Sequence, residues 1–255
     1  MSSQAAAVAR PLSISGSLRR YIRVTAMALL LLACVPLYYA WKLSGASTNP
    51  WPRHFLGGIG WIAGVRVRVV GTPARRGAFL LANHVSWIDI PVLSAATGAA
   101  FVGHDGLATF PLLRWLCAMN DTVFIARHDR ASVAAQVQQV REAVRDTGAL
   151  AIFPEGTTSD GTGLLPFKSS LLSALDPVPP GIAVYPVWLD YGANSAELAW
   201  VGEENGLDNF RRIVGRAQPL EVTVHFLPQL DGPHLASRKT MAAAAREAIL
   251  AAMQG

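Results

Sequence analysis

Cysteine and charge are both scarce in this sequence. Its two cysteines, Cys34 and Cys117, are too few for a disulfide framework, and neither has the paired spacing of a zinc site. Charged residues make up only 15% of the chain and hydrophobic residues 51%, whereas ordinary soluble domains contain about 25% charged residues. These shortages argue against a disulfide-stapled secreted scaffold and against a cysteine zinc centre, and they predict contact with a membrane.

Several nucleophile and phosphate motifs are also missing. The sequence has no G-x-S-x-G elbow, no cysteine beside a histidine, and no loop ending in Gly-Lys-[Ser/Thr]. It shows no segment that interleaves basic and aromatic residues as single-strand binders do, although its formal net charge is +5. Instead, basic residues cluster just before the longest apolar run: Arg10, Arg19, Arg20 and Arg23. We therefore expect a lipid bilayer as partner and no nucleic acid.

The longest apolar run covers residues 24–41, which carry no charge. As a helix it reaches about 27 Å, against a hydrocarbon core of about 30 Å, and is a marginal span. Tyr38, Tyr39 and Trp41 at its end match an interfacial aromatic belt. A signal peptide is the alternative, but these bulky residues stand where a small-residue cleavage site belongs.

A second apolar stretch, residues 55–65, is too short to cross a membrane alone. Because Pro36 can bend the first helix, we expect the two segments to form a re-entrant or interfacial hairpin rather than one straight crossing. The chain is thus divided into a membrane-anchoring segment at residues 1–64 and a folded domain at residues 65–255.

From Val65 onward, short β-branched runs alternate with helical stretches, which predicts an α/β fold with a central mixed sheet flanked by helices. The expected strands are residues 65–70, 79–82, 99–102, 122–125, 150–153, 182–188, 199–201 and 222–226. The expected helices are residues 90–95, residues 130–147, which end at Gly148, and residues 235–253. Pro186 within an expected strand indicates an edge position or a strand end.

The segment Asn83-His84-Val85-Ser86-Trp87-Ile88-Asp89 follows an apolar strand and precedes a helix. Parallel sheets place ligands at such strand ends. His84 is expected in the turn and Asp89 in the first helical turn, where its carboxylate can orient the imidazole as a general base. The alternative is structural, with Ser86 and Asp89 forming a helix capping box.

Two later segments also follow short strands. Val123-Phe124-Ile125-Ala126-Arg127 ends in an arginine whose fork suits phosphate or carboxylate oxygens, although taken alone this segment favours an ordinary surface arginine. The stretch 153–161, F-P-E-G-T-T-S-D-G, brings polar groups around Gly156, although a plain turn has the same composition. Lys168 offers a cation nearby.

In this order, the segments N-H-x-S-x-x-D, F-I-x-R, F-P-E-G-T and a Pro-Val strand resemble the glycerolipid H-x4-D acyltransferases, the family of lysophosphatidate acyltransferases. The likeness spans residues 80–187. It implies that His84 and Asp89 are catalytic and that Arg127 and the Glu155-Gly156-Thr157 loop bind the acceptor's polar head. With them we assign substrate binding to the neighbouring motif residues: Asn83, Ser86, Phe124, Thr158 and Lys168.

The resemblance implies direct transfer of a fatty acyl chain from acyl-CoA or acyl carrier protein to the hydroxyl of a lysolipid, without an acyl-enzyme. We expect no bound cofactor and no metal. Since both donors are cytosolic, we expect the catalytic domain on the cytoplasmic face of the plasma or inner membrane. Lysophosphatidate is the first candidate acceptor, giving phosphatidic acid.

One departure from the family pattern matters for the acceptor. The third motif commonly reads F-P-E-G-T-R-S, and here Thr158 replaces the arginine. A lyso-ornithine lipid or another lysolipid is therefore the alternative acceptor. Two rival classes are a lipid-binding protein without catalysis, which should lack the His–Asp pair, and a metal hydrolase, for which no further histidine lies at ligand spacing.

Overall fold

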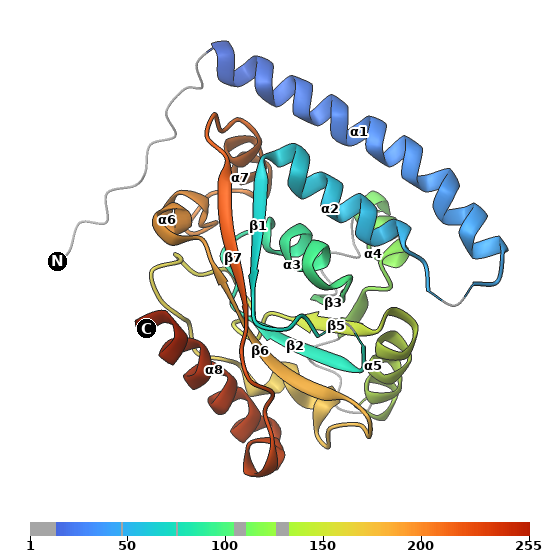
Figure 1. Ribbon diagram of the computed structural model, residues 1–255, viewed down its shortest axis with the longest axis vertical. Helices are drawn as coiled ribbons and strands as arrows, with labels where there is room; N and C mark the ends of the chain where they lie inside the picture. Colours follow the sequence, from blue (N-terminus) through green and yellow to red (C-terminus); the bar gives the residue numbers. More distant parts are fainter. Residues whose placement is uncertain (1–13, 47, 75, 105–110, 126–132) are drawn as a thin grey trace.

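The computed structural model describes residues 14–46, 48–74, 76–104, 111–125 and 133–255. Its centre is a seven-stranded sheet in the order β1-β7-β6-β2-β5-β3-β4 (Figure 1). All neighbouring strands run parallel except β6 and β7, which run antiparallel, so the sheet is mixed as predicted. The strands are β1 (Val65–Val70), β2 (Ala78–Ala82), β3 (Ala100–His104), β4 (Val123–Ile125), β5 (Ala149–Ile152), β6 (Ala183–Asp190) and β7 (Leu220–Phe226).

The helices of the described residues cover both faces of the sheet. They are α1 (Ile14–Leu43), α2 (Trp51–Ala63), α3 (Asp89–Thr97), α4 (Pro111–Met119), α5 (Val133–Thr147), α6 (Ser195–Leu198), α7 (Gly206–Val214) and α8 (Arg238–Gln254). Short 3-10 turns are η3 (Ser169–Leu175), η4 (Gly192–Asn194) and η5 (Gly232–Leu235). The predicted start of α5 at residues 130–132 lies outside the described residues, and Gly148 ends the helix at φ 86° as expected.

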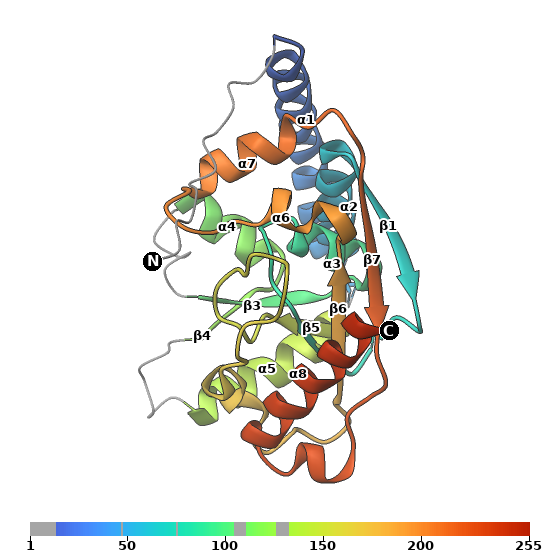
Figure 2. The same cartoon turned by 90° about the vertical axis from the view of Figure 1, so that its left-hand side faces the viewer.

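Strand β2 shows why the core has two halves. All five of its residues are buried, as in a strand covered on both faces. Successive side chains point to opposite faces: Leu80 packs with α2, α3 and α7, whereas Phe79 and Leu81 pack with α5, η3 and α8. Figure 2 shows α5 and α8 together, away from α1, α2 and α7. The carboxyl end of β2 is therefore held rigidly from both sides.

Two strand expectations need correction. Residues 199–201 form a loop instead of a strand: Trp200 N donates to Val85 O at 2.9 Å, and the Thr158 hydroxyl donates to Trp200 O. Pro186 lies in an interior strand rather than at the sheet edge. The missing N–H is tolerated because the β6–β7 register begins only at Val187, one residue later.

Helix α1 lies along the outside of α2 (Figure 1), and side chains toward both of its ends bond to the domain. Near its start, Arg23 donates to the carbonyls of Val214 and Arg216, each at 3.0 Å. Near its end, the Tyr39 hydroxyl accepts from Trp115 Nε1 at 3.1 Å. The helix continues through Pro36, so the hairpin arises from the turn between α1 and α2 and not from a bend at the proline.

Candidate active site

His84 and Asp89 form a hydrogen-bonded pair where β2 meets α3. His84 lies in the turn after β2, and Asp89 is the first residue of α3. His84 Nδ1 is 2.7 Å from Asp89 Oδ2. The imidazole stacks on the Phe153 ring, with centroids 4.1 Å apart and the planes tilted by 11°. Since Asp89 engages Nδ1, Nε2 remains as the nitrogen that can accept a proton from a substrate hydroxyl.

The Asp89 carboxylate is completely buried and accepts four hydrogen bonds from described residues. Oδ2 accepts from His84 Nδ1, from Val85 N at 2.7 Å and from Ser86 N at 3.0 Å. Oδ1 accepts from the Tyr191 hydroxyl at 2.5 Å. The Ser86 hydroxyl donates to Asn209 Oδ1 at 3.0 Å, so only one half of the expected capping box is present, the bond from Ser86 N to the Asp89 carboxylate.

Glu155 is also buried, and it braces the histidine turn. Its Oε1 accepts from His84 N at 2.7 Å, and its Oε2 accepts from Leu165 N at 2.9 Å. The carbonyl of His84 in turn accepts from Ser159 N at 2.8 Å and from the Ser159 hydroxyl at 3.0 Å. Both backbone groups of His84 are thus fixed by the 153–161 loop, and both oxygens of Glu155 are occupied by backbone N–H groups.

Burial raises the pKa of Glu155 to about 7, although the His84 and Leu165 N–H groups act in the opposite direction. A carboxyl whose pKa is higher in the folded state binds its proton more tightly when folded. Its contribution to stability is therefore fully present below pH about 4.5 and is lost as the pH rises to about 7. The loss is on the order of 3 kcal/mol.

Glu155→Gln should lack this pH dependence because an amide does not ionise. We expect the free energy of unfolding of the wild type minus that of the variant to decrease between pH 4.5 and 7.5, as measured by denaturant titration. A difference that stays constant over this range would contradict the assignment. The variant also places an amide N–H against a backbone N–H, which lowers its stability at every pH by about 1–3 kcal/mol.

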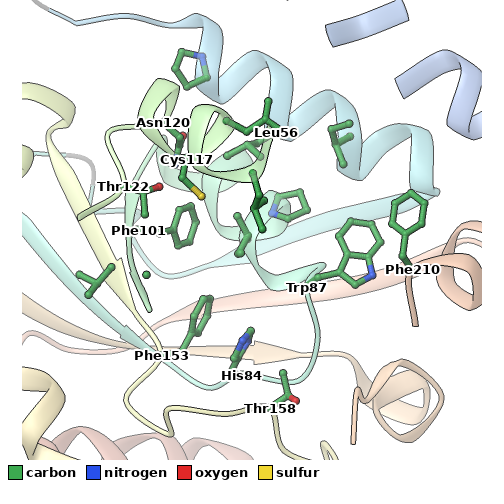
Figure 3. Close-up of a pocket in the computed structure, with 18 of the residues that line it drawn as sticks. Leu56, His84, Trp87, Phe101, Cys117, Asn120, Thr122, Phe153, Thr158 and Phe210 are labelled. Carbon is green, nitrogen blue, oxygen red and sulfur yellow. The ribbon is translucent and has the colours of Figure 1, made fainter. Parts of the chain in front are cut away.

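The Gly156-Thr157-Thr158 part of the same loop faces a cavity of about 1090 Å³ (Figure 3). Gly156 has φ 69°, a backbone conformation that favours glycine. A Cβ there would lie 3.1 Å from Leu171 Cδ1 and 3.2 Å from Lys168 Nζ, so any side chain would crowd both neighbours. His84 lies in the same wall of the cavity as Thr158 and Phe153, as Figure 3 shows.

The cavity extends from His84 toward the N-terminal helices and is lined mainly by apolar side chains. Helix α2 contributes Phe55, Leu56 and Ile59, and α1 contributes Cys34 and Tyr38. Cys117 of α4 lies in the same lining, so both cysteines are packing residues of the cavity wall. The volume lies just above the range of about 300–1,000 Å³ for small-molecule pockets. It suits a long apolar ligand whose polar end meets His84.

Several residues expected to bind substrate do not line this cavity. Asn83 exchanges two hydrogen bonds with the backbone of Leu189, at 2.7 and 3.1 Å, and so ties the turn to β6. Ser86 is bound to Asn209, and neither Phe124 nor Glu155 reaches the cavity. Lys168 is exposed beside Gly156. Arg127 lies outside the described residues, and its role stays a prediction.

Tyr191 is the site residue that the motifs did not indicate. It follows β6 directly and is fully buried. Burial raises the pKa of its hydroxyl well above the usual range, and the neighbouring Asp89 carboxylate raises it further. The signal in the sequence was only its place just after a strand, where polar groups of neighbouring strands meet.

Comparison with known proteins gives consistent matches. A family model described as acyltransferase matches residues 66–190. The lyso-ornithine lipid O-acyltransferase of Rhodobacter capsulatus is 32% identical over 96% of this chain and 93% of that protein. The enzyme of the same name from Pseudomonas aeruginosa is 32% identical over 92% of each chain. A 1-acyl-sn-glycerol-3-phosphate acyltransferase of Neisseria gonorrhoeae is 38% identical over 42% of this chain and 44% of that protein.

One solved structure has the same fold. The crystal structure of the 1-acyl-sn-glycerophosphate acyltransferase of Thermotoga maritima matches with a TM-score of 0.62 and 20% identity. The match covers 94% of this chain and 96% of that one. It therefore includes the N-terminal helices as well as the sheet.

Proposed function

This chain belongs to the glycerolipid acyltransferase family and is an acyltransferase, and we propose that it transfers a fatty acyl chain from a thioester donor to the free hydroxyl of a lysolipid. The observation that carries the proposal is the His84–Asp89 pair at the wall of a large apolar cavity. The donor is acyl-CoA or acyl carrier protein. The test incubates the detergent-solubilised protein with each labelled donor and a panel of lysolipids, and identifies the product by mass.

The proposed reaction passes one proton through His84 in two transfers. Nε2 takes the proton of the acceptor hydroxyl while its oxygen attacks the thioester carbonyl. The buried Asp89 carboxylate stabilises the imidazolium that forms. When the C–S bond breaks, the thiolate leaves and takes that proton from His84, which returns the imidazole to its starting state. The stacked ring of Phe153 and the fixed backbone of His84 hold the imidazole in place for this step.

Thr158 favours a lyso-ornithine lipid over lysophosphatidate as the acceptor. A phosphate headgroup is bound best by arginine forks, and Thr158 stands where the family pattern has an arginine. Its hydroxyl donates to the Trp200 carbonyl and so secures the 199–205 loop. The two relatives matched over nearly the whole chain carry the lyso-ornithine name.

Thr158→Arg should shift acceptor preference toward phosphate. We expect the ratio of kcat/KM for lysophosphatidate to that for lyso-ornithine lipid to rise about tenfold, equivalent to about 1.4 kcal/mol. Thr158→Val is the matched control, because it removes the bond to Trp200 without adding charge. If both variants change the ratio equally, the effect comes from loosening of the 199–205 loop and the charge argument fails.

We place the enzyme on the cytoplasmic face of the membrane, with α1 in the interface. Helix α1 is long and apolar enough to span a bilayer, with a mean hydropathy of 1.8 in its most apolar stretch. Yet its two ends bind α7 and α4 of the same domain, and large apolar side chains including Leu29 and Leu32 remain exposed along it. A helix held flat in this way lies in the interface rather than crossing. Protease protection that put the N-terminus and Gly255 on opposite sides would overturn this placement.

A further inference from the structure

Tyr191 links the far end of β6 to the carboxylate of the candidate catalytic pair. The residue follows Asp190, the last residue of β6, and its side chain is fully buried. Its hydroxyl donates to Asp89 Oδ1 at 2.5 Å. Two residues earlier, the Leu189 backbone is bonded to the Asn83 side chain, directly before His84. The end of β6 is therefore connected to the histidine turn on both sides of His84.

The two oxygens of Asp89 have unequal support. Oδ2 accepts three hydrogen bonds, one of them from His84. Among the described residues, Oδ1 accepts only from Tyr191. A buried carboxylate oxygen without a donor is costly, by about 1–3 kcal/mol or more for a charged group. Without the tyrosine hydroxyl, the carboxylate would rotate to share the remaining donors, and Oδ2 would leave its alignment with Nδ1.

We propose that Tyr191 is a positioning residue, whose hydroxyl holds Oδ1 so that Oδ2 stays aligned with His84. The inference rests on the proposed acyl transfer, in which Asp89 acts through His84. Tyr191 does not line the cavity, so it acts without touching substrate. Its raised pKa means that the hydroxyl keeps its proton and remains a donor throughout the working pH range.

The kinetic test is Tyr191→Phe in two backgrounds. In the wild-type background we expect kcat to fall about tenfold while KM for donor and acceptor stays within about twofold. In an Asp89→Asn background we expect the same change to alter kcat by less than about twofold. The asparagine oxygen is still held by Val85 N and Ser86 N, and the negative charge that Tyr191 keeps in line with His84 is gone. Contacting residues that work as a unit show such non-additivity.

Tyr185→Phe is the matched control. Tyr185 lies on the same strand, and its hydroxyl contacts Gln229 at 3.2 Å on the exposed side. This variant should keep the wild-type kcat. If Tyr191→Phe lowers kcat equally in both backgrounds, or only together with a large fall in Tm, the residue is merely structural and the proposal is wrong. An unchanged kcat in the wild-type background would overturn it as well.

A second readout needs no substrate. A proton held between His84 Nδ1 and Asp89 Oδ2 should give a downfield NMR resonance, assignable because His84→Ala removes it. We expect Tyr191→Phe to shift or broaden this resonance and Tyr185→Phe to leave it unchanged. If the wild type acylates no lysolipid, the proposed function fails, whereas an unshifted resonance in Tyr191→Phe overturns the positioning role alone.

Discussion

Replacing His84 with alanine is expected to lower acyl transfer by about two orders of magnitude or more. General-base catalysis typically contributes about 10²–10⁴-fold, and in this site the imidazole is the group placed to accept the hydroxyl proton. Its Nδ1 is bound to Asp89, its ring is stacked on Phe153, and both of its backbone groups are fixed. The measurement is kcat with saturating acyl donor and the acceptor found in the lysolipid panel.

The control for this variant is His234→Ala. His234 is exposed in η5 and is not among the residues that line the cavity. It should leave kcat unchanged and should show that loss of a histidine does not by itself disturb the enzyme. Residual transfer in His84→Ala above about one hundredth of the wild type would remove His84 from the role of general base.

Residues close together in the sequence were the easiest part of the site to predict. His84 and Asp89 are five residues apart and follow an apolar strand. Ligand sites of parallel sheets lie at the carboxyl ends of strands, and the turn into α3 brings the two side chains together there. Glu155 was expected to bind the acceptor's polar head, but its carboxylate accepts from the backbone N–H groups of His84 and Leu165. A buried carboxylate that accepts two backbone N–H groups cannot be distinguished by sequence from one that binds substrate.

The contact between Tyr191 and Asp89 could not be predicted, and the reason is different. Tyr191 is 102 residues from Asp89, and the contact exists only because β2 and β6 are neighbours in the sheet. The strand order depends on the packing of all the helices, which local patterns do not encode. The wrongly predicted strand at residues 199–201 has the same origin. Its β-branched and aromatic composition favours a strand, but the backbone of Trp200 bonds to Val85 and Thr158 instead of to a neighbouring strand.

The fold itself followed more directly from the sequence. Strand β2 is five consecutive apolar residues between turns, which is typical of a strand buried on both faces. The valines of α5 recur at helical spacing, and Val140 and Val144 are buried against the sheet. The hairpin of α1 and α2 was predicted, but from a bend at Pro36. The helix continues through this proline, and the chain reverses in the turn between α1 and α2.

Asp89→Asn is expected to lower kcat about a hundredfold while leaving the fold intact. The asparagine oxygen can take the place of Oδ2 and accept from His84, Val85 and Ser86. Its amide then faces the Tyr191 oxygen, which can accept as well as donate. The tautomer and position of His84 are preserved, and the negative charge that stabilises the imidazolium is removed. Asp89→Ala is less informative, because it leaves three buried N–H donors without a partner.

The double variant His84→Ala, Asp89→Asn decides whether the two residues act as one unit. If Asp89 contributes only by stabilising the imidazolium of His84, its charge has no effect once the imidazole is gone. The double variant should then be no slower than His84→Ala alone, as for catalytic groups that depend on one another. A further tenfold loss in the double variant would show that Asp89 acts on the substrate or on the loop independently. The carboxylate would then be more than the partner of His84 that the 2.7 Å hydrogen bond indicates.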